Sequence, residues 1–200
     1  MGAEARWLRP PACGLLLVGV VATMMAAPAF AQERVRPHGL WGRATFGMSR
    51  LEQSCDSCRF EGAVTASNFN LTAGYAWSRV AVGLELGAIS FQNNQGDVSM
   101  VLVTASWYPW STSGAFLKGG VGSSKFLGTE DADGIRDAEG SGFGAQTELG
   151  IDLSMGNLGV TSVVFAQYAH QSAVTAYGTF PAGRNLTQWN FGLAIGLTVF

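Results

Sequence analysis

The feature that most constrains this chain is an alternation of apolar and polar residues that recurs in short segments. In the segment 66–78, Phe69, Leu71 and Tyr75 share one face, whereas Asn70 and Thr72 fall on the other. Side chains alternate between the two faces of a β-strand, so this period of two predicts strands with one oily face. We count about eight such segments, near 40–51, 66–78, 80–92, 97–109, 115–128, 141–155, 158–171 and 187–200.

The less apolar face of these segments predicts what surrounds the strands. It is rich in Gly, Ala, Ser, Thr, Asn and Gln, whereas the solvent face of a soluble β-sandwich should be rich in Lys and Glu. Beyond residue 31, no run approaches 18 apolar residues, yet the whole chain has a mean hydropathy of +0.20 and only 13% of its residues are charged. This combination favours an all-β, closed antiparallel transmembrane β-barrel with an up-and-down meander. The few mid-strand charges fall on the lumen face and predict a polar lumen network of Arg43, Glu85, Lys118, Glu148 and Asp152.

The connections between the segments alternate in length. Tight turns are predicted at 78–79, 111–114 and 156–157. The other connections, near 52–65, 93–96, 129–140 and 172–186, are mostly longer or more polar. Short periplasmic turns opposite longer external loops are typical of outer-membrane barrels, whereas Greek-key crossings give no reason for this alternation.

Aromatic residues cluster at the predicted tight turns. Trp77, Trp107, Tyr108 and Trp110 lie at or beside these turns. Because amphipathic rings prefer the membrane interface, we expect these four side chains at the periplasmic edge of the bilayer.

The first 31 residues have the three regions of a cleaved secretory signal peptide. Arg6 and Arg9 precede a short apolar run, and small residues precede the expected cleavage site after Ala31. We therefore expect one barrel domain over 32–200. Its 10 basic and 13 acidic residues give a net charge of −3, without the basic face that nucleic-acid binding needs.

The last predicted segment, 187–200, contains the run from Trp189 to Phe200 and brings the chain to an aromatic residue. With the signal peptide and the eight segments, it resembles the small eight-stranded outer-membrane barrels of the OmpA/OmpX type. The resemblance implies the bacterial outer membrane as location and the barrel assembly machinery as a partner. One departure is that Phe200 falls off the apolar parity, so either a bulge shifts it or it lies past the strand ladder. Because the last predicted strand reaches Phe200, we expect no peptidoglycan-binding domain of the kind that follows the barrel in some members of that family.

Two loops carry candidate sites. Cys55 and Cys58 form a C-x-x-C pair in the first long loop, where export to an oxidising space favours a local disulfide over a redox motif or zinc. In the acidic loop 129–140, Asp131, Asp133 and Asp137 are candidate calcium ligands, although a solvated acidic loop is the favoured interpretation. That loop also offers divalent-ion bridges to lipopolysaccharide.

His170 and Ser172 resemble the His-x-Ser pair of the lipid A deacylase barrels. In those enzymes, a downstream Glu completes the site, whereas here no acid lies between Asp152 and Phe200, and Arg184 stands near the expected distance. A structural histidine at the barrel rim is the favoured interpretation.

These observations predict a non-enzymatic outer-membrane barrel with a structural or surface-interaction role and a side-chain-filled lumen. An eight-stranded barrel is only just wide enough for its inward side chains. The expected surroundings are outer-membrane lipids and lipopolysaccharide; we expect a monomer without cofactor, metal or nucleic-acid partner. The alternatives are a deacylase-like barrel enzyme and a narrow small-solute pore.

Overall fold

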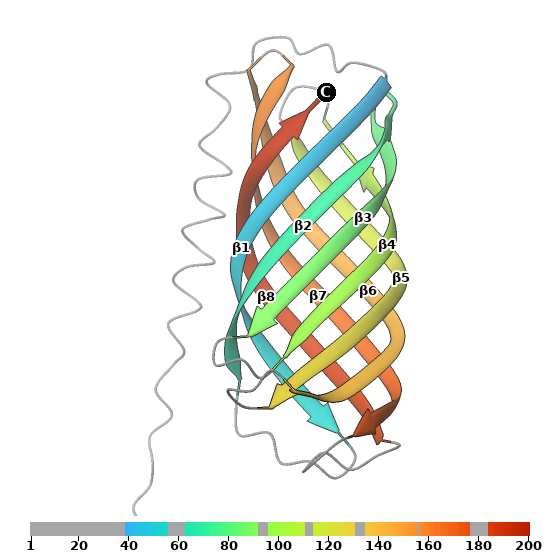
Figure 1. Ribbon diagram of the computed structural model, residues 1–200. Helices are drawn as coiled ribbons and strands as arrows, with labels where there is room; N and C mark the ends of the chain where they lie inside the picture. Colours follow the sequence, from blue (N-terminus) through green and yellow to red (C-terminus); the bar gives the residue numbers. More distant parts are fainter. Residues whose placement is uncertain are drawn as a thin grey trace, which may run out of the picture.

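The computed structural model describes residues 39–55, 63–91, 96–110, 114–130, 135–155, 157–176 and 184–200, and these form a closed antiparallel barrel (Figure 1). Each strand pairs with its neighbour in the chain, and β1 pairs with β8 to close the sheet. The predicted all-β meander of eight strands is therefore confirmed. The strands are β1 (Gly39–Cys55), β2 (Val64–Ala76), β3 (Val80–Phe91), β4 (Asp97–Trp107), β5 (Ala115–Glu130), β6 (Ile135–Met155), β7 (Leu158–Ala176) and β8 (Arg184–Val199).

Several strands are longer than the alternation predicted, and apart from Gly39 at the start of β1, the added length lies at one end. β1 continues from residue 51 to Cys55, β6 begins at Ile135 rather than 141, and β7 continues from 171 to Ala176. We call this the loop end of the barrel and the opposite end, with Gly39 and Phe200, the turn end. The sequence-based strands stopped where the outward face ceased to be apolar, whereas the backbone pairing continues.

The turn end is closed by short backbone connections. Between β2 and β3, the amide of Trp77 donates to the carbonyl of Val80 at 2.7 Å. The amide of Tyr108, just after β4, donates to the carbonyl of Arg79 at 2.8 Å and ties two neighbouring turns together. These contacts place the β2–β3 turn and the residues just after β4 on one rim of the barrel. Of the other two expected turns, residues 111–113 and 156 lie outside the described residues.

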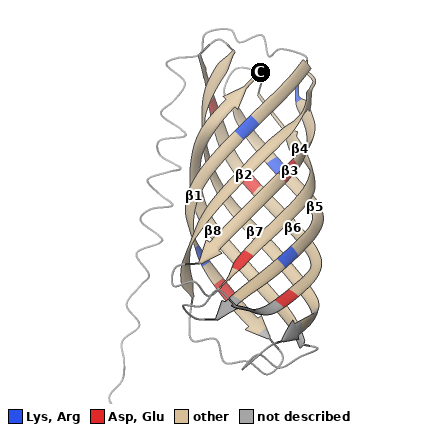
Figure 2. Ribbon diagram, viewed as in Figure 1, with Lys and Arg blue, Asp and Glu red and all other residues tan. Residues whose placement is uncertain are grey.

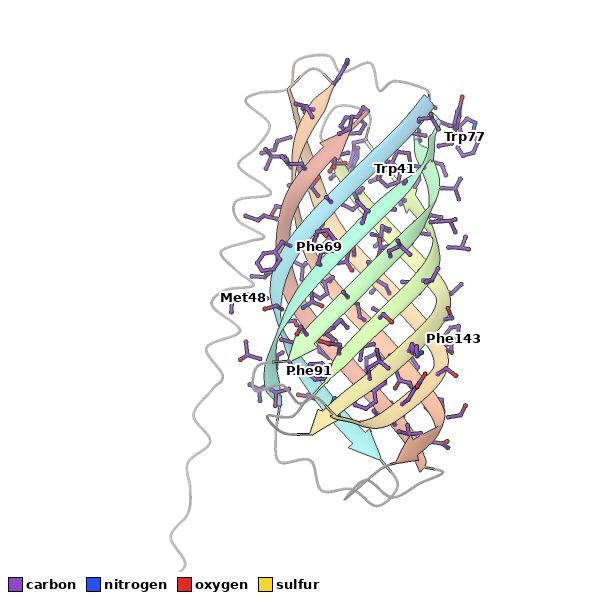
Figure 3. All side chains as sticks on the ribbon, in the orientation of Figure 1. Trp41, Met48, Phe69, Trp77, Phe91 and Phe143 are labelled. Atoms are coloured by element: carbon purple, nitrogen blue, oxygen red, sulfur yellow. The ribbon has the colours of Figure 1, made fainter. Side chains whose placement is uncertain are left out.

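The outward face over most of the strand length is apolar, as predicted. Leu84 is 61% exposed and Ile195 is 67% exposed, and Figure 3 shows Met48, Phe69 and Trp77 pointing away from the barrel. Within the described ranges, no helix is long and apolar enough to cross a membrane. A closed barrel with a lipid-compatible band satisfies every ladder hydrogen bond internally, which the bilayer core requires.

Phe200 settles the question raised by its parity. The β7–β8 register is irregular only between Gln171 and Val174, far from the end of β8, and β8 itself ends at Val199. Phe200 therefore lies past the ladder, where its amide donates to the carbonyl of Asn157 at 3.0 Å. A side chain at Gly159, on the inner face of β7, would meet the Phe200 ring, so the ring lies toward the lumen side.

Candidate functional site

The five charged residues assigned to the lumen all point into the barrel and are at most 2% exposed. The structure brings them together as one pair and one group of three. Arg43 pairs with Asp152, and Lys118 lies between Glu85 and Glu148. Charges of opposite sign are thus paired inside the barrel, where water does not screen them. Figure 2 shows that charged residues are few along the strands and that several of them lie toward the loop end.

Arg43 is held from several strands at the turn end. Its Nη2 lies 2.8 Å from Asp152 Oδ2, and its Nε donates to Thr198 Oγ1 at 3.1 Å. The Tyr108 hydroxyl accepts from Arg43 Nη2 at 3.2 Å and donates to Asp152 Oδ2 at 3.0 Å. Thr161 donates to the other carboxylate oxygen at 2.6 Å. β1, β6, β7, β8 and the turn after β4 therefore meet on one buried ion pair.

Aromatic rings close the lumen around this ion pair. The guanidinium carbon of Arg43 lies 4.1 Å from the ring centre of Phe116 and 5.2 Å from that of Trp41, within cation–π range. Trp41 and Tyr108 are themselves buried, and the Tyr108 ring packs against Phe116 with centroids 5.5 Å apart. We call Trp41, Ala81, Tyr108, Phe116, Val163, Phe165 and Ala194 the inner apolar cluster.

Tyr108 corrects one sequence prediction. We expected it at the membrane interface with Trp77, Trp107 and Trp110, and those three are indeed 47%, 53% and 63% exposed. Tyr108 is only 4% exposed and faces inward. The alternation itself carried the signal, because Trp107 faces outward at the end of β4 and the next residue must then face the lumen.

Lys118 is the centre of the second charged group. Its Nζ lies 2.9 Å from Glu148 Oε1 and also forms an ion pair with Glu85 Oε2. Thr72 donates to the same Glu85 oxygen at 2.7 Å. We call Glu85, Lys118 and Glu148 the lumen triad. One ammonium group holds two carboxylates that would otherwise repel each other at close range in a water-poor interior.

A chain of amide side chains continues from the triad toward the loop end. Gln146 donates to Glu148, and Gln167 donates to Gln146 Oε1 at 2.7 Å. Asn190 donates to Gln167 Oε1 at 2.7 Å and to Asn68 Oδ1 at 2.7 Å. Residues far apart in sequence meet here because closure of the barrel brings β2, β6, β7 and β8 around one narrow interior.

Beyond the amides, the interior becomes apolar, which the sequence analysis missed. Along β8, inward Ala194 belongs to the inner apolar cluster, Asn190 belongs to the polar layer, and Leu186 belongs to a second apolar cluster nearer the loop end. This outer apolar cluster comprises Leu51, Ala66, Ile89, Phe91, Val98, Met100, Leu102, Phe126, Ala169, Val174 and Leu186. Its signal was present as apolar residues on lumen parity near the ends of β3 and β4, such as Ile89 and Val98.

Where the interior changes from polar to apolar, the outward face changes from apolar to polar. On β3, outward Ala88 is followed by outward Ser90, and on β1, Met48 is followed by Arg50. Every strand has such a step from an apolar to a polar outward residue. We call the polar positions at this step the polar ring: Arg50, Ser67, Ser90, Ser99, Ser123, Ser141, His170 and Thr187. Closer to the turn end, outward Thr147 on β6 and Ser162 on β7 are isolated polar positions in the apolar face. The strands beyond this ring are built like a water-soluble barrel, with an apolar interior and a polar exterior.

The remaining predicted sites lie wholly or partly outside the described residues. Cys58, Asp131 and Asp133 are outside them, and the side chains of Cys55 and Asp137 are not described although their backbones belong to β1 and β6. The disulfide and the calcium site therefore stay predictions.

His170 and Ser172 both lie on the outward side of β7, at and just beyond the polar ring. His170 Nδ1 is 3.0 Å from Thr187 Oγ1, and Ser172 is exposed opposite Ser141. Among the described residues, no carboxylate forms an ion pair or a hydrogen bond with His170. The acid that the sequence failed to supply from downstream is not supplied by a described residue of another strand.

Comparison with known proteins agrees with this geometry at the level of the fold. No protein-family model and no curated protein matches the chain. Neisserial surface protein A is 13% identical, with 82% of this chain and 99% of that chain covered and a TM-score of 0.53. The attachment invasion locus protein Ail of Yersinia pestis is 12% identical, with 81% and 99% covered and a TM-score of 0.50. The chain thus has the fold of the small eight-stranded outer-membrane barrels, in agreement with the expected location in the bacterial outer membrane.

Proposed function

We propose that this protein is a non-enzymatic outer-membrane barrel with a closed lumen, which carries a structural or surface-interaction role at the cell surface. The observation that carries the proposal is the filling of the lumen at three successive levels. The inner apolar cluster, the polar layer with the lumen triad, and the outer apolar cluster follow one another along the barrel. We include in the proposal a monomeric state and insertion by the barrel assembly machinery.

The filled interior favours this role over a small-solute pore. A conducting path needs a continuous column of water, whereas Phe116 and Phe126 are each at most 2% exposed at opposite ends of the interior. Between them, the triad and the amides use one another as hydrogen-bond partners. The mid-strand charges thus have a structural task, which is to fill the interior of a narrow barrel with groups of opposite sign that pair with one another. Among the described residues, Arg43 Nη1, Glu85 Oε1 and Glu148 Oε2 have no hydrogen-bond partner.

The position of His170 and Ser172 favours the non-enzymatic role over a deacylase-like enzyme. A serine nucleophile needs a base and, in the resembling enzymes, an acid that orients this base. The described partner of His170 is the hydroxyl of Thr187, which carries no charge to stabilise an imidazolium ring. These side chains therefore fit a polar rim where the barrel leaves the membrane.

Conductance of the refolded mature chain in a planar lipid bilayer tests the closed lumen. We expect no discrete conductance steps, and the control for folding is a different migration of unboiled and boiled protein on electrophoresis. Discrete steps from the heat-modifiable form alone would overturn the closed lumen. Recovery of the expressed protein in the soluble periplasmic fraction would overturn the membrane barrel itself.

Incubation with lipid A, followed by mass spectrometry of the extracted lipid, tests the enzyme alternative. We expect no loss of an acyl chain with the wild-type protein. The matched control is His170→Ala, a change at a partly exposed outward position. Loss of an acyl chain with the wild type but not with this variant would replace our proposal with the enzymatic one.

A further inference from the structure

Three aromatic side chains form a continuous outward cluster just below the polar ring. Trp189 and Phe191 on β8 are stacked, with an interplanar angle of 2° and centroids 6.0 Å apart. Tyr168 on β7 is paired with Trp189 in the register and packs on it at 4.7 Å. Trp189 is 46% exposed and Phe191 is 49% exposed, so this cluster presents ring surface to the surroundings of the barrel.

Polar and charged groups border the same cluster. On its loop-end side, His170 and Thr187 are joined by the 3.0 Å contact described above. On the neighbouring strand, Arg50 is paired with Phe191 and Glu52 with Trp189 in the β1–β8 register. Figure 1 shows β8 and β1 side by side along the wall. Arg50 contacts Glu52 only at 4.0 Å and its side chain is 68% exposed, so its guanidinium donors can reach a ligand.

The opposite wall of the barrel has no such arrangement. β3, β4 and β5 lie across the barrel from β8 and β1 in the closed order. At the polar ring, these strands present Ser90, Ser99 and Ser123, and no described residue of their outward face is aromatic near that height. A general preference of aromatic rings for the membrane interface would distribute them around the whole barrel. Single outward aromatic residues also lie next to the ring on β2 (Phe69) and β6 (Phe143). Among the described residues at this height, however, rings in contact with one another beside an exposed arginine are found on the β7–β8–β1 wall, and this arrangement calls for a local reason.

From this juxtaposition, we propose that the outward face of β7, β8 and β1 binds the phosphorylated sugar headgroup of an outer-leaflet glycolipid. A sugar ring has an apolar face that packs on aromatic rings and hydroxyl groups that His170 and Thr187 can hydrogen-bond. Arg50 supplies the planar, charged donor set that suits a phosphate. Below the headgroup, outward Leu193 and Ile195 continue the apolar surface along which acyl chains lie.

The combination of aromatic rings with an exposed arginine favours a glycolipid over a simple anionic phospholipid as the ligand. A phosphate alone would be satisfied by Arg50 and would leave the rings of Tyr168 and Trp189 without a specific contact. A ligand that uses both features must combine a phosphate with a ring-shaped polar group at the level of the interface. The proposal deepens the surface-interaction role above and rests on its membrane location, but not on a closed lumen.

Lipid retention by the refolded protein tests the proposal. The mature chain is exchanged from detergent into phosphatidylcholine bilayers with bisphosphorylated lipid A, monophosphorylated lipid A or phosphatidylglycerol, and bound lipid is counted by native mass spectrometry. We expect the bisphosphorylated form to be retained best and phosphatidylglycerol least. Arg50→Gln should weaken retention of lipid A about tenfold, the effect of losing one charge-assisted hydrogen bond.

Two further variants separate the site from general surface charge and from folding. Trp189→Leu keeps the position apolar and should also weaken lipid A retention. Lys125→Gln removes an exposed cation beyond the ring on β5, where Lys125 pairs with Glu139 at 2.5 Å, and should leave retention unchanged. Equal losses for Lys125→Gln and Arg50→Gln, equal retention of phosphatidylglycerol, or no effect of either site variant would each overturn the proposal. Because every sample is first shown to be heat-modifiable, these results are independent of the conductance test.

Discussion

The barrel has two parts, one between the turn end and the polar ring and one beyond the ring. They differ in which face of the sheet carries the apolar side chains. Along β3, the membrane-level part turns Leu84 outward and Glu85 inward, whereas the part beyond turns Ser90 outward and Ile89 inward. The strand does not change its parity, since Glu85 and Ile89 face the same way. The chemistry of the two faces is exchanged because the surroundings change from lipid to water.

The interior of each part is filled by a different kind of side-chain contact. At membrane level, polar side chains must face inward because lipid surrounds the barrel, and there they form ion pairs and hydrogen bonds with one another. Beyond the ring, water covers the outer face, so the interior can be an ordinary apolar core such as that around Leu51 and Phe126. The same closed sheet thus encloses polar side chains that pair with one another at membrane level and an apolar core beyond the ring.

The strongest test of this comparison is the removal of the cation at the centre of the polar layer. Lys118→Met leaves the carboxylates of Glu85 and Glu148 in the interior without their shared partner, which should lower the free energy of unfolding by about 3–5 kcal/mol. Urea unfolding in lipid vesicles, followed by tryptophan fluorescence, measures this change. The matched control is Lys125→Met, which breaks an exposed pair and should cost at most about 1 kcal/mol. Equal losses would show that the interior at Lys118 is as wet as the surface.

Arginine substitutions at two outward positions of β3 test whether the polar ring marks the edge of the bilayer. Leu84→Arg places a guanidinium in the lipid band and should cost about 2–4 kcal/mol of unfolding free energy, whereas Ser90→Arg at the polar ring should cost about 0–1 kcal/mol. The same vesicle unfolding assay compares the two variants. If both variants lose the same stability, the polar ring does not mark the edge of the bilayer.

The smallest expected effect tests the apolar interior beyond the ring. Ile89→Val removes one buried methyl group from the outer apolar cluster and should cost about 0.5–1.5 kcal/mol. Thr65→Ser removes one methyl group from an exposed outward position beyond the ring and should change stability by less than about 0.5 kcal/mol. A neutral Ile89→Val would argue that this part of the interior is loosely packed, contrary to its burial at 3% exposure.

The extent to which the sequence predicted this molecule depended on the range of the interactions involved. Alternation is local, so the outward position of Phe69 and Leu71 and the inward position of Arg43 could be read directly from the chain. The prediction that Tyr108 lies at the membrane interface was wrong because it rested on the nearby turn, whereas the alternation after Trp107 places Tyr108 in the lumen. The loop-end limits of β1, β6 and β7 were predicted too short because the alternation of apolar and polar residues weakens there, whereas the backbone pairing continues.

The candidate lumen site was predictable as a set of residues but not as a set of contacts. Arg43 and Asp152 are 109 positions apart, and the sequence does not state which of three carboxylates meets which of two cations. The selection follows from the register of seven neighbouring strand pairs and from the closure of β1 on β8. Only then do residues at equal height on distant strands share one interior.

The sequence by itself thus determined that the chain forms strands and which residues share a face, because these depend on neighbours along the chain. The tertiary structure decided which charges pair, that Ile89 and Phe126 join an apolar core, and that Tyr168, Trp189 and Arg50 meet on one wall. The physical reason is that alternation distinguishes two faces without assigning a solvent to either. Closure and the height of each residue relative to the bilayer assign that solvent, and with it the chemistry of each side chain.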